Sequence, residues 1–252
     1  MSIPKIALVT GAARRLGRAM ALTLAEDGYD VAIHCRTSTD EAQSTAAEIT
    51  ASGRRATVVE ADLADEAATE TVVARAQAAL GPIGVLVNNA STFELDNLLT
   101  ADRASWDKHI EVNLRAPVVL AQGFVRQLPA GAHGAIVNLL DQRIHNLTPN
   151  FLSYSAAKMG LWAVTQVLAR ELAPRIRVNA IGPGPTLAHP AMSDGRFAEL
   201  VAALPLRRGP SPEDIAEALR FILRMEAMTG QMITLDGGQQ LGWLTPKAPK
   251  GE

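Results

Sequence analysis

The sequence contains little that would support a disulfide framework, a membrane span or a nucleic-acid interface. Its 252 residues include one cysteine, Cys35, which cannot form an intrachain disulfide, so we expect a reducing compartment, the cytoplasm. No uninterrupted apolar run approaches the roughly 18 residues of a membrane span, and residues 1–10 are expected to form a first strand rather than a signal peptide. Lys and Arg number 24 against 26 Asp and Glu, a formal charge of -2, so nucleic acid is not an expected partner.

The composition gives no support for disorder or for several domains. Hydrophobic residues make up 48% of the chain and charged residues 20%, which is typical of a globular protein. No repeat of fixed period and no linker rich in Pro, Gly and Ser divides the sequence. We therefore expect one domain over residues 1–244, followed by a flexible tail over residues 245–252.

Short apolar, β-branched segments alternate with longer Ala-rich amphipathic segments along most of the chain. This alternation predicts an α/β fold, a doubly wound sheet of about seven parallel strands with helices on both faces. The expected strands are residues 5–10, 30–35, 55–60, 85–88, 135–140, 177–181 and 231–235. The expected helices are residues 16–27, 40–52, 66–80, 102–127, 154–172 and 212–225.

One connection is longer than the others. It follows the sixth expected strand, spans residues 182–196 and is rich in proline and glycine at its start. Ligands of open α/β sheets bind beyond the carboxyl ends of the strands. We therefore expect this segment to form a lid over the substrate.

A turn containing glycine follows the first expected strand and opens a helix, with the sequence Thr10-Gly11-Ala12-Ala13-Arg14-Arg15-Leu16-Gly17-Arg18. Gly11 and Gly17 permit a tight turn and close packing, so that backbone N–H groups and the positive helix end can face a pyrophosphate. Glycine turns after strands are common in α/β proteins and the plain G-x-G-x-x-G string is absent. The loop alone therefore leaves dinucleotide binding open.

The end of the second expected strand indicates which dinucleotide is bound. NAD sites usually place a carboxylate here, whereas this chain has Arg36 followed by the hydroxyls of Thr37 and Ser38, which suit a 2′-phosphate. We therefore predict NADP, used as NADPH; a solvated loop arginine is the alternative interpretation of Arg36. Asp62, just past the third expected strand, is expected either to accept from the adenine amino group or to cap a helix.

Tyr154 and Lys158 are four residues apart on an expected helix, so their side chains share one face. A phenol is a poor acid or base at neutral pH, and a nearby ammonium group lowers its pKa. The pair is therefore a candidate for proton transfer, with Lys158 also able to hold ribose hydroxyls. An incidental surface pair is the alternative. The pair lies at the start of the helix after the fifth strand, on the ligand side of the expected sheet, and this position favours the proton-transfer interpretation.

Three further motifs, together with this pair, resemble the short-chain dehydrogenase/reductase family: Asn88-Asn89-Ala90, Asn113 within Glu111-Val112-Asn113-Leu114, and Asn179-Ala180-Ile181-Gly182-Pro183-Gly184. The resemblance extends over residues 5–238. It implies a Rossmann-type fold and hydride transfer between a nicotinamide and a carbonyl or imine carbon. It also implies that Tyr154 is the acid/base, Lys158 its modulator, Asn113 the holder of a proton-relay water, and Thr186 a neighbour of the nicotinamide amide.

The cofactor contacts follow from the residues and the resemblance together. They are Gly11, Arg14, Arg15, Leu16, Gly17, His34, Arg36, Thr37, Ser38, Asp62, Leu63, Asn89, Ala90, Tyr154, Lys158, Pro183, Gly184 and Thr186.

Two residues depart from the family pattern. Arg15 replaces the usual middle glycine of the loop, and Asp141 replaces the usual catalytic serine. A serine hydroxyl can donate to a substrate carbonyl, whereas an ionised aspartate only accepts and repels a developing oxyanion. Both exchanges resemble the pteridine reductase branch, as does Asn-Asn-Ala-Ser followed by Phe93. That resemblance implies a pterin beside the Phe93 ring, and the expected substrate contacts are Arg15, Ser91, Phe93, Asp141 and Tyr154.

These features favour a cytoplasmic NADPH-dependent reductase of a pterin-type (dihydropteridine) or related C=N substrate. Such a reduction protonates nitrogen and creates no alkoxide, and an aminopterin edge offers N–H donors to Asp141. A carbonyl reductase acting on a ketone or 3-oxoacyl thioester is one alternative. A non-catalytic dinucleotide-binding regulatory protein is another. Phe93 as a core residue and Asp141 as a strand-end cap are the purely structural interpretations.

The family resemblance also concerns assembly. Its members usually associate through helices corresponding to residues 102–127 and 154–172, so we expect a homo-oligomer, with a tetramer favoured. His145 and His189 fall in expected site loops, and no pair of histidines has the spacing of metal ligands. No metal site is therefore predicted.

Overall fold

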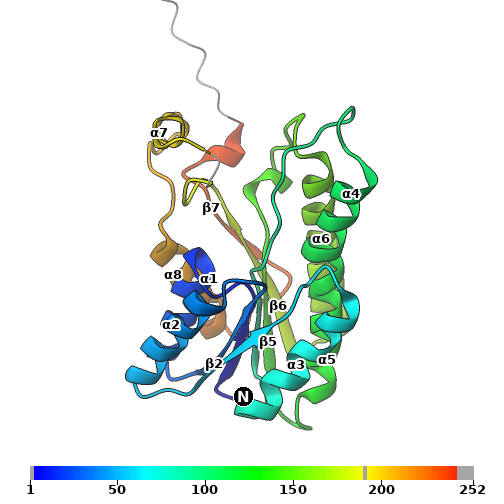
Figure 1. The fold of residues 1–252 in the computed structure, drawn as a ribbon, viewed down its shortest axis with the longest axis vertical. Helices are drawn as coiled ribbons and strands as arrows, with labels where there is room; N and C mark the ends of the chain where they lie inside the picture. The colour runs from blue at the N-terminus through cyan, green and yellow to red at the C-terminus, as the bar shows by residue number, and fades with distance from the viewer. Residues whose placement is uncertain (1–2, 190–191, 243–252) are drawn as a thin grey trace, which may run out of the picture.

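A seven-stranded parallel sheet organises the protein, in the order β3-β2-β1-β4-β5-β6-β7 (Figure 1). The computed structural model describes residues 3–189 and 192–242, so the expected tail at 245–252 lies outside the described residues. The sheet confirms the predicted α/β fold class. Its strands are β1 (Ile6–Val9), β2 (Asp30–Cys35), β3 (Ala56–Glu60), β4 (Val85–Asn88), β5 (Gly134–Leu139), β6 (Ile176–Pro183) and β7 (Met232–Leu235).

Helices cover both faces of the sheet (Figure 1). Successive strand residues point to opposite faces, so Ala7 and Val9 pack into one core cluster and Ile6 and Leu8 into the other. Helices α1, α2 and α8 cover the first face, and α3, α5 and α6 cover the second. The bounds are α1 (Arg15–Glu26), α2 (Thr39–Ala51), α3 (Glu66–Leu80), α4 (Arg103–Ile110), α5 (Ala116–Gln127), α6 (Leu152–Glu171), α7 (Asp194–Ala202) and α8 (Pro212–Arg224).

The strand order reverses direction between β1 and β4, and ligands of such sheets bind at this switch point. The two chain segments leaving these strands are cross-linked by polar contacts. The Thr10 hydroxyl accepts from the backbone N–H groups of Asn89 and Ala90, each at 2.9 Å. The Asn89 side chain donates to the carbonyls of Thr10 and Gly11 at 2.8 and 3.1 Å. The two loops therefore form one rigid rim.

The helix expected over residues 102–127 has a break in its regular pattern. Between α4 and α5, residues Glu111–Arg115 form a π-helical segment, η1, which contains Asn113. Pro117 has no N–H, so the Asn113 carbonyl lacks the donor that a regular α-helix would give it. The preceding residue, Ala116, donates its N–H to the carbonyl of Glu111, five residues earlier, which is the π-helical pattern. The proline thus explains why the wider turn lies at this position.

The segment over residues 182–204, which includes the connection expected at 182–196, is not a continuous loop. It contains the end of β6 and the helix α7, which Ser193 caps by accepting from Arg196 N. None of the residues of α7 is buried, although Phe197, Leu200 and Val201 have the spacing of one helix face. Residues 190–191 lie outside the described residues.

Short 3₁₀ turns complete the structure at Gln142–Ile144 (η2) and Gln239–Leu241 (η3). Within residues 3–189 and 192–242, no helix combines the length and the apolar character needed to cross a membrane.

Candidate active site

A cavity of about 440 Å³ lies at the switch point of the sheet. It brings together most of the predicted cofactor contacts: Gly11, Arg14, Arg15, Leu16, Gly17, His34, Arg36, Thr37, Ser38, Asp62, Leu63, Asn89 and Ala90. The predicted substrate contact Ser91 also lines it. Residues that the sequence analysis did not single out complete the wall: Ala13, Cys35, Thr92, Glu94, Lys108 and Val112.

The glycines of the first loop leave space that no side chain could share. A Cβ on Gly17 would lie 2.2 Å from the Gly11 carbonyl oxygen, which is backbone and cannot move aside. Gly11 itself has φ +63°, and its Cβ would lie 3.0 Å from Ala90 Cα. Three arginines, Arg14, Arg15 and Arg36, line the same cavity. A backbone cradle with cationic walls fits a phosphate-bearing dinucleotide.

The His34 side chain holds the loop that contains Gly11 in place. Its Nδ1 accepts from Gly11 N at 3.1 Å, so the other nitrogen, Nε2, carries the proton and faces the Ala61 carbonyl at 3.1 Å. Burial lowers the pKa of His34 to about 4. The imidazole is therefore neutral and acts by holding the loop, since both ring nitrogens are already engaged within the protein.

This lowered pKa predicts a loss of stability in mild acid. The unfolded chain takes up a proton on His34 near pH 6.5 and the folded chain only near pH 4, so stability is lost as pH falls between these values. We expect the free energy of unfolding to decrease by about 2 kcal/mol more in the wild type than in His34→Gln between pH 7.5 and 5. Urea unfolding of both proteins measures this, and equal decreases would contradict the assignment.

The residues expected to select the coenzyme also line the cavity. Arg36 is exposed and forms no ion pair within the described part of the chain, and Thr37 and Ser38 line the cavity beside it. The Asp62 carboxylate accepts from Ala64 N at 3.0 Å, in a turn before α3. Asp65, and not Asp62, caps α3. The helix-cap interpretation of Asp62 is therefore wrong.

Asp141 and Tyr154 meet beyond the carboxyl end of β5. The Tyr154 hydroxyl donates to Asp141 Oδ2 at 2.9 Å. The carboxylate also caps η2, because Oδ1 accepts from Arg143 N at 2.8 Å, and Oδ2 lies 3.0 Å from Arg143 Nη1. Asp141 thus caps a turn, but the interpretation that its carboxylate only orders a loop is wrong, because the same carboxylate also contacts the candidate acid.

The electrostatics of Tyr154 differ from the expectation based on its spacing to Lys158. Burial and the Asp141 carboxylate raise the pKa of Tyr154 well above its usual value, and Arg143 and Ser91 oppose this only in part. Lys158 donates to the Leu139 carbonyl at 2.7 Å, and burial lowers its pKa to about 8. The expected lowering of the phenol pKa is therefore wrong: Tyr154 is held protonated, as an acid that has a proton to give.

Aromatic rings form one wall next to Tyr154. Phe93 stacks on Phe151 with ring centroids 4.4 Å apart, and it meets the Tyr154 ring in a T-shaped arrangement with centroids 4.8 Å apart. Phe93 is only partly buried and belongs to neither main core cluster, so the core interpretation is wrong. His189 lies 6.0 Å from the same ring. Phe151 was not predicted; it has φ 64°, a conformation that non-glycine residues adopt mainly where the surroundings impose it.

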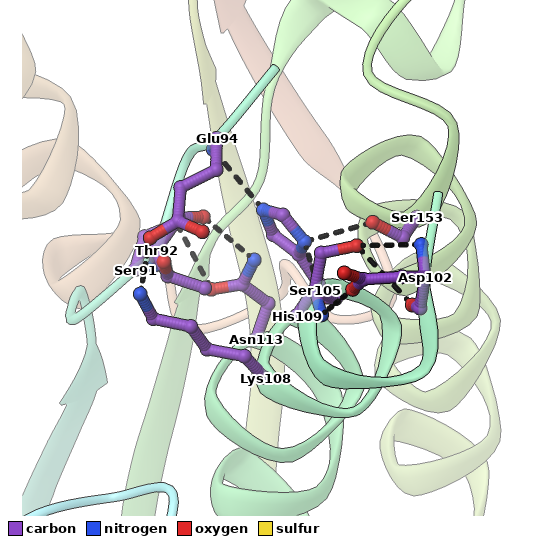
Figure 2. A network of polar contacts seen from close by, with 9 residues as sticks. All are labelled: Ser91, Thr92, Glu94, Asp102, Ser105, Lys108, His109, Asn113 and Ser153. Atoms are coloured by element: carbon purple, nitrogen blue, oxygen red, sulfur yellow. Dashed lines mark hydrogen bonds and ion pairs between the residues drawn. The ribbon is translucent and has the colours of Figure 1, made fainter. Parts of the chain in front are cut away.

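Polar contacts hold the segment that carries Ser91 and Phe93 (Figure 2). The Asn113 carboxamide oxygen accepts from Ser91 Oγ at 3.0 Å and from Thr92 N at 2.9 Å, and its nitrogen donates to Thr92 O at 2.9 Å. Asn113 therefore fixes the wall between the cavity and Tyr154. Its expected role in holding a water stays a prediction.

A second cluster, centred on His109, was missed by the sequence analysis. His109 Nε2 accepts from Glu94 N at 3.1 Å, and Nδ1 lies 2.8 Å from Ser153 Oγ, as Figure 2 shows. Ser153 in turn donates to the buried Asp96 carboxylate. These side chains tie the segment after β4 to the start of α6, immediately before Tyr154. No sequence motif marks them, because they are far apart in the chain.

The remaining predicted contacts lie outside the cavity lining. Gly184 packs against Asp236, whose Cα would lie 2.6 Å from an added Cβ, and Thr186 Oγ1 donates to the Gly184 carbonyl at 3.1 Å. Pro183 ends β6. Arg15 reaches this segment, donating to the carbonyls of residues 187 and 188 at 3.2 and 3.0 Å. Arg15 also has φ 56°, which explains why relatives of the resembled family place glycine there.

Among the described residues, no group of three or more His, Cys, Asp or Glu side chains lies close enough to hold a metal ion. His145, the other loop histidine, lies with Nε2 3.4 Å from Thr234 Oγ1.

Comparison with protein families identifies the fold and its chemistry. The family model described as short chain dehydrogenase matches residues 5–198. The chain belongs to the short chain dehydrogenase family. It is therefore an oxidoreductase, as the sequence predicts.

Individual relatives of the family show two kinds of similarity. FolM Alternative dihydrofolate reductase 1 from Brucella canis, complexed with NADP, has 45% identity and a TM-score of 0.92, covering 96% of both chains. The same protein from Brucella suis, also with NADP, has 46% identity and a TM-score of 0.92 over 95% of this chain and 96% of that one. The 3-oxoacyl-[acyl-carrier-protein] reductase FabG of Staphylococcus aureus is 34% identical over 246 residues, 96% of this chain and 100% of the relative. NADP in both structures agrees with the predicted coenzyme.

Proposed function

We propose that the protein is an NADPH-dependent reductase of a dihydropterin or a related substrate with a conjugated C=N bond. The observation that carries this proposal is the 2.9 Å contact between the Tyr154 hydroxyl and the Asp141 carboxylate, where carbonyl reductases of the resembled family keep a serine. The similarity to two alternative dihydrofolate reductases, at 45% and 46% identity, supports it.

The charge at Asp141 favours one substrate class. When bound, the coenzyme supplies a hydride to carbon. Tyr154 gives its proton to the substrate nitrogen, and the carboxylate accepts from N–H groups at the edge of the heterocycle. A carbonyl substrate would instead place a developing oxyanion beside the same carboxylate, and the repulsion would raise the barrier. The Phe93 ring offers a flat apolar surface on which a pterin can stack.

The coenzyme is assigned by the residues of the cavity. Gly11, Gly17 and the arginines of the first loop would hold the pyrophosphate, and Arg36 the 2′-phosphate. Lys158, buried beside Tyr154, would contact the nicotinamide ribose. Asn113 would keep the wall between the two halves of the site in place.

A panel of substrates tests the proposal directly. Purified protein is assayed for NADPH oxidation with dihydropterins and dihydrofolate, and separately with simple ketones and a 3-oxoacyl thioester. We expect turnover with the first group to exceed turnover with the second. The similarity to the Staphylococcus aureus 3-oxoacyl reductase supports the alternative, and turnover of ketones or thioesters without any turnover of dihydropterins would favour it.

The assignment of Arg36 makes its own prediction. Arg36→Asp removes a charged donor and places a carboxylate in the cavity, so NADPH should bind about 10- to 150-fold more weakly, the equivalent of about 1.5–3 kcal/mol, with little loss for NADH. Titration of coenzyme binding by fluorescence measures both affinities. Arg224→Asp, in α8 and outside the cavity lining, is the control. Equal losses for both coenzymes in Arg36→Asp would refute the 2′-phosphate contact.

The quaternary structure and location remain part of the proposal. Exposed apolar side chains occur on the helices expected to associate, at Trp106 in α4 and at Met159 and Val167 in α6. A homotetramer would cover these side chains, and light scattering of the purified protein tests it. We also retain a single domain and a cytoplasmic location as predictions.

A further inference from the structure

We infer that Arg143 is a positioning residue for proton delivery: it orients the Asp141 carboxylate toward Tyr154 and joins this pair to the aromatic wall. No sequence motif singles out Arg143, and it is absent from the cavity lining. The inference rests on the proposed function only in its choice of first substrate, because proton donation by Tyr154 is common to the reduction of C=N and C=O bonds.

Arg143 holds the carboxylate at both oxygens. Its backbone N–H donates to Asp141 Oδ1 at 2.8 Å, and Nη1 donates to Oδ2 at 3.0 Å. Oδ2 is the oxygen that also accepts from the Tyr154 hydroxyl, at 2.9 Å. Because Arg143 holds both oxygens, the Asp141 carboxylate cannot rotate away from the Tyr154 hydroxyl. The side chains of Arg143 and Asp141 are only 23% and 14% exposed, so solvent screens the ion pair weakly.

The guanidinium also lies against the aromatic rings. Its central carbon is 5.1 Å from the centroid of the Phe93 ring and 4.9 Å from that of Phe151, within the range of cation–π attraction. One side chain thus contacts the predicted stacking surface for the substrate and the carboxylate next to the proton donor. Movement of either part would be transmitted to the other through Arg143.

The charges around Tyr154 come from several elements. Asp141 and Arg143 approach from the turn after β5, Lys158 lies one turn further along α6, and the His109 ring is 6.1 Å away on α4. Asp141 raises the pKa of Tyr154 and Arg143 lowers it. Removing Arg143 therefore leaves a weaker acid beside a less constrained carboxylate, and both changes slow proton donation.

Two substitutions separate the charge from the packing. Arg143→Met keeps the unbranched apolar part of the side chain and removes the cation, whereas Arg143→Lys keeps the cation. We expect Arg143→Met to lower kcat about ten- to a hundredfold with the KM for NADPH changed less than about twofold, because Arg143 does not line the cavity. The solvent deuterium isotope effect on kcat should increase. Arg143→Lys should recover part of kcat and lower the isotope effect again.

Arg224→Met is the matched control. Arg224 is the last residue of α8, its Nη2 lies 3.7 Å from Asp27 Oδ1, and it is outside the site. The variants are compared with a dihydropterin, and with a ketone or 3-oxoacyl thioester if the wild type turns over only those. Failure of the wild type on dihydropterins refutes the proposed function, and the test of Arg143 then uses the carbonyl substrate. A folded Arg143→Met with wild-type kcat and isotope effect overturns the inference. So does a loss in Arg143→Met that Arg143→Lys fails to reduce while remaining folded.

Discussion

Tyr154→Phe is expected to lower kcat by about 10²- to 10⁴-fold, the usual contribution of a general acid. The substitution removes the hydroxyl that donates to Asp141 at 2.9 Å, and leaves the ring that packs against Phe93. Coenzyme affinity should change less than kcat, because the substitution keeps the aromatic ring and leaves Lys158 and the residues that line the 440 Å³ cavity in place. Stopped-flow measurement of NADPH oxidation, with a separate binding titration, checks both expectations.

Tyr29→Phe is the control for this substitution, because Tyr29 is the other tyrosine of the chain and packs into the hydrophobic core. The same experiment separates an enzyme from a dinucleotide-binding regulatory protein. If the wild type turns over nothing on a broad panel and Tyr154→Phe leaves biological activity unchanged, the regulatory alternative is favoured.

Asp141→Ser is expected to reduce kcat/KM for a dihydropterin by about 10- to 150-fold, the range for loss of a charged hydrogen bond. It should also increase kcat/KM for a ketone, because a hydroxyl can donate to a carbonyl oxygen and carries no charge to repel an oxyanion. Without the carboxylate, the largest electrostatic cause of the raised pKa of Tyr154 is also lost. Steady-state kinetics with both substrates measure the exchange of specificity.

Asp141→Asn provides the matched comparison, because it keeps the shape of the side chain, removes the charge and replaces one acceptor oxygen by an N–H donor. If the charge matters, Asn and Ser should both lose dihydropterin activity and both should gain on ketones, because each removes the repulsion and offers a donor to the carbonyl oxygen. Unchanged dihydropterin turnover in Asp141→Ser would show that the carboxylate has no part in proton delivery. Thermal unfolding of both variants checks that the loss of a partner for Arg143 has not unfolded the turn.

The fold was predictable because its signals are local and repeated. Strands buried on both faces are continuous apolar runs, and α1, α3 and α8 show their core-facing residues at helical spacing. The helix α7 was missed although Phe197, Leu200 and Val201 have helical spacing; the helix is only 9 residues long and follows a segment rich in proline and glycine. The π-helical turn at Asn113 was missed as well, although Pro117 is a visible cause.

The candidate site was predictable where function imposes a residue type on a loop. Gly11, Gly17 and Arg36 could be found in this way, as could the Asp141 and Tyr154 pair. Side chains that act by position could not: Phe151 and Arg143 become neighbours of Phe93 only after folding.

The direction in which the pKa of Tyr154 shifts could not be predicted from the sequence either. Spacing suggests the influence of Lys158, but burial and the position of Asp141 decide the outcome.

A crystal structure of the protein with NADP and a dihydropterin tests the central claim most directly. The account predicts that the heterocycle lies about 3.5–4 Å from the Phe93 ring, with an N–H of its edge about 2.7–3.2 Å from an Asp141 oxygen. A dihydropterin bound elsewhere, or bound at Phe93 with Asp141 touching no atom of it, would contradict the account.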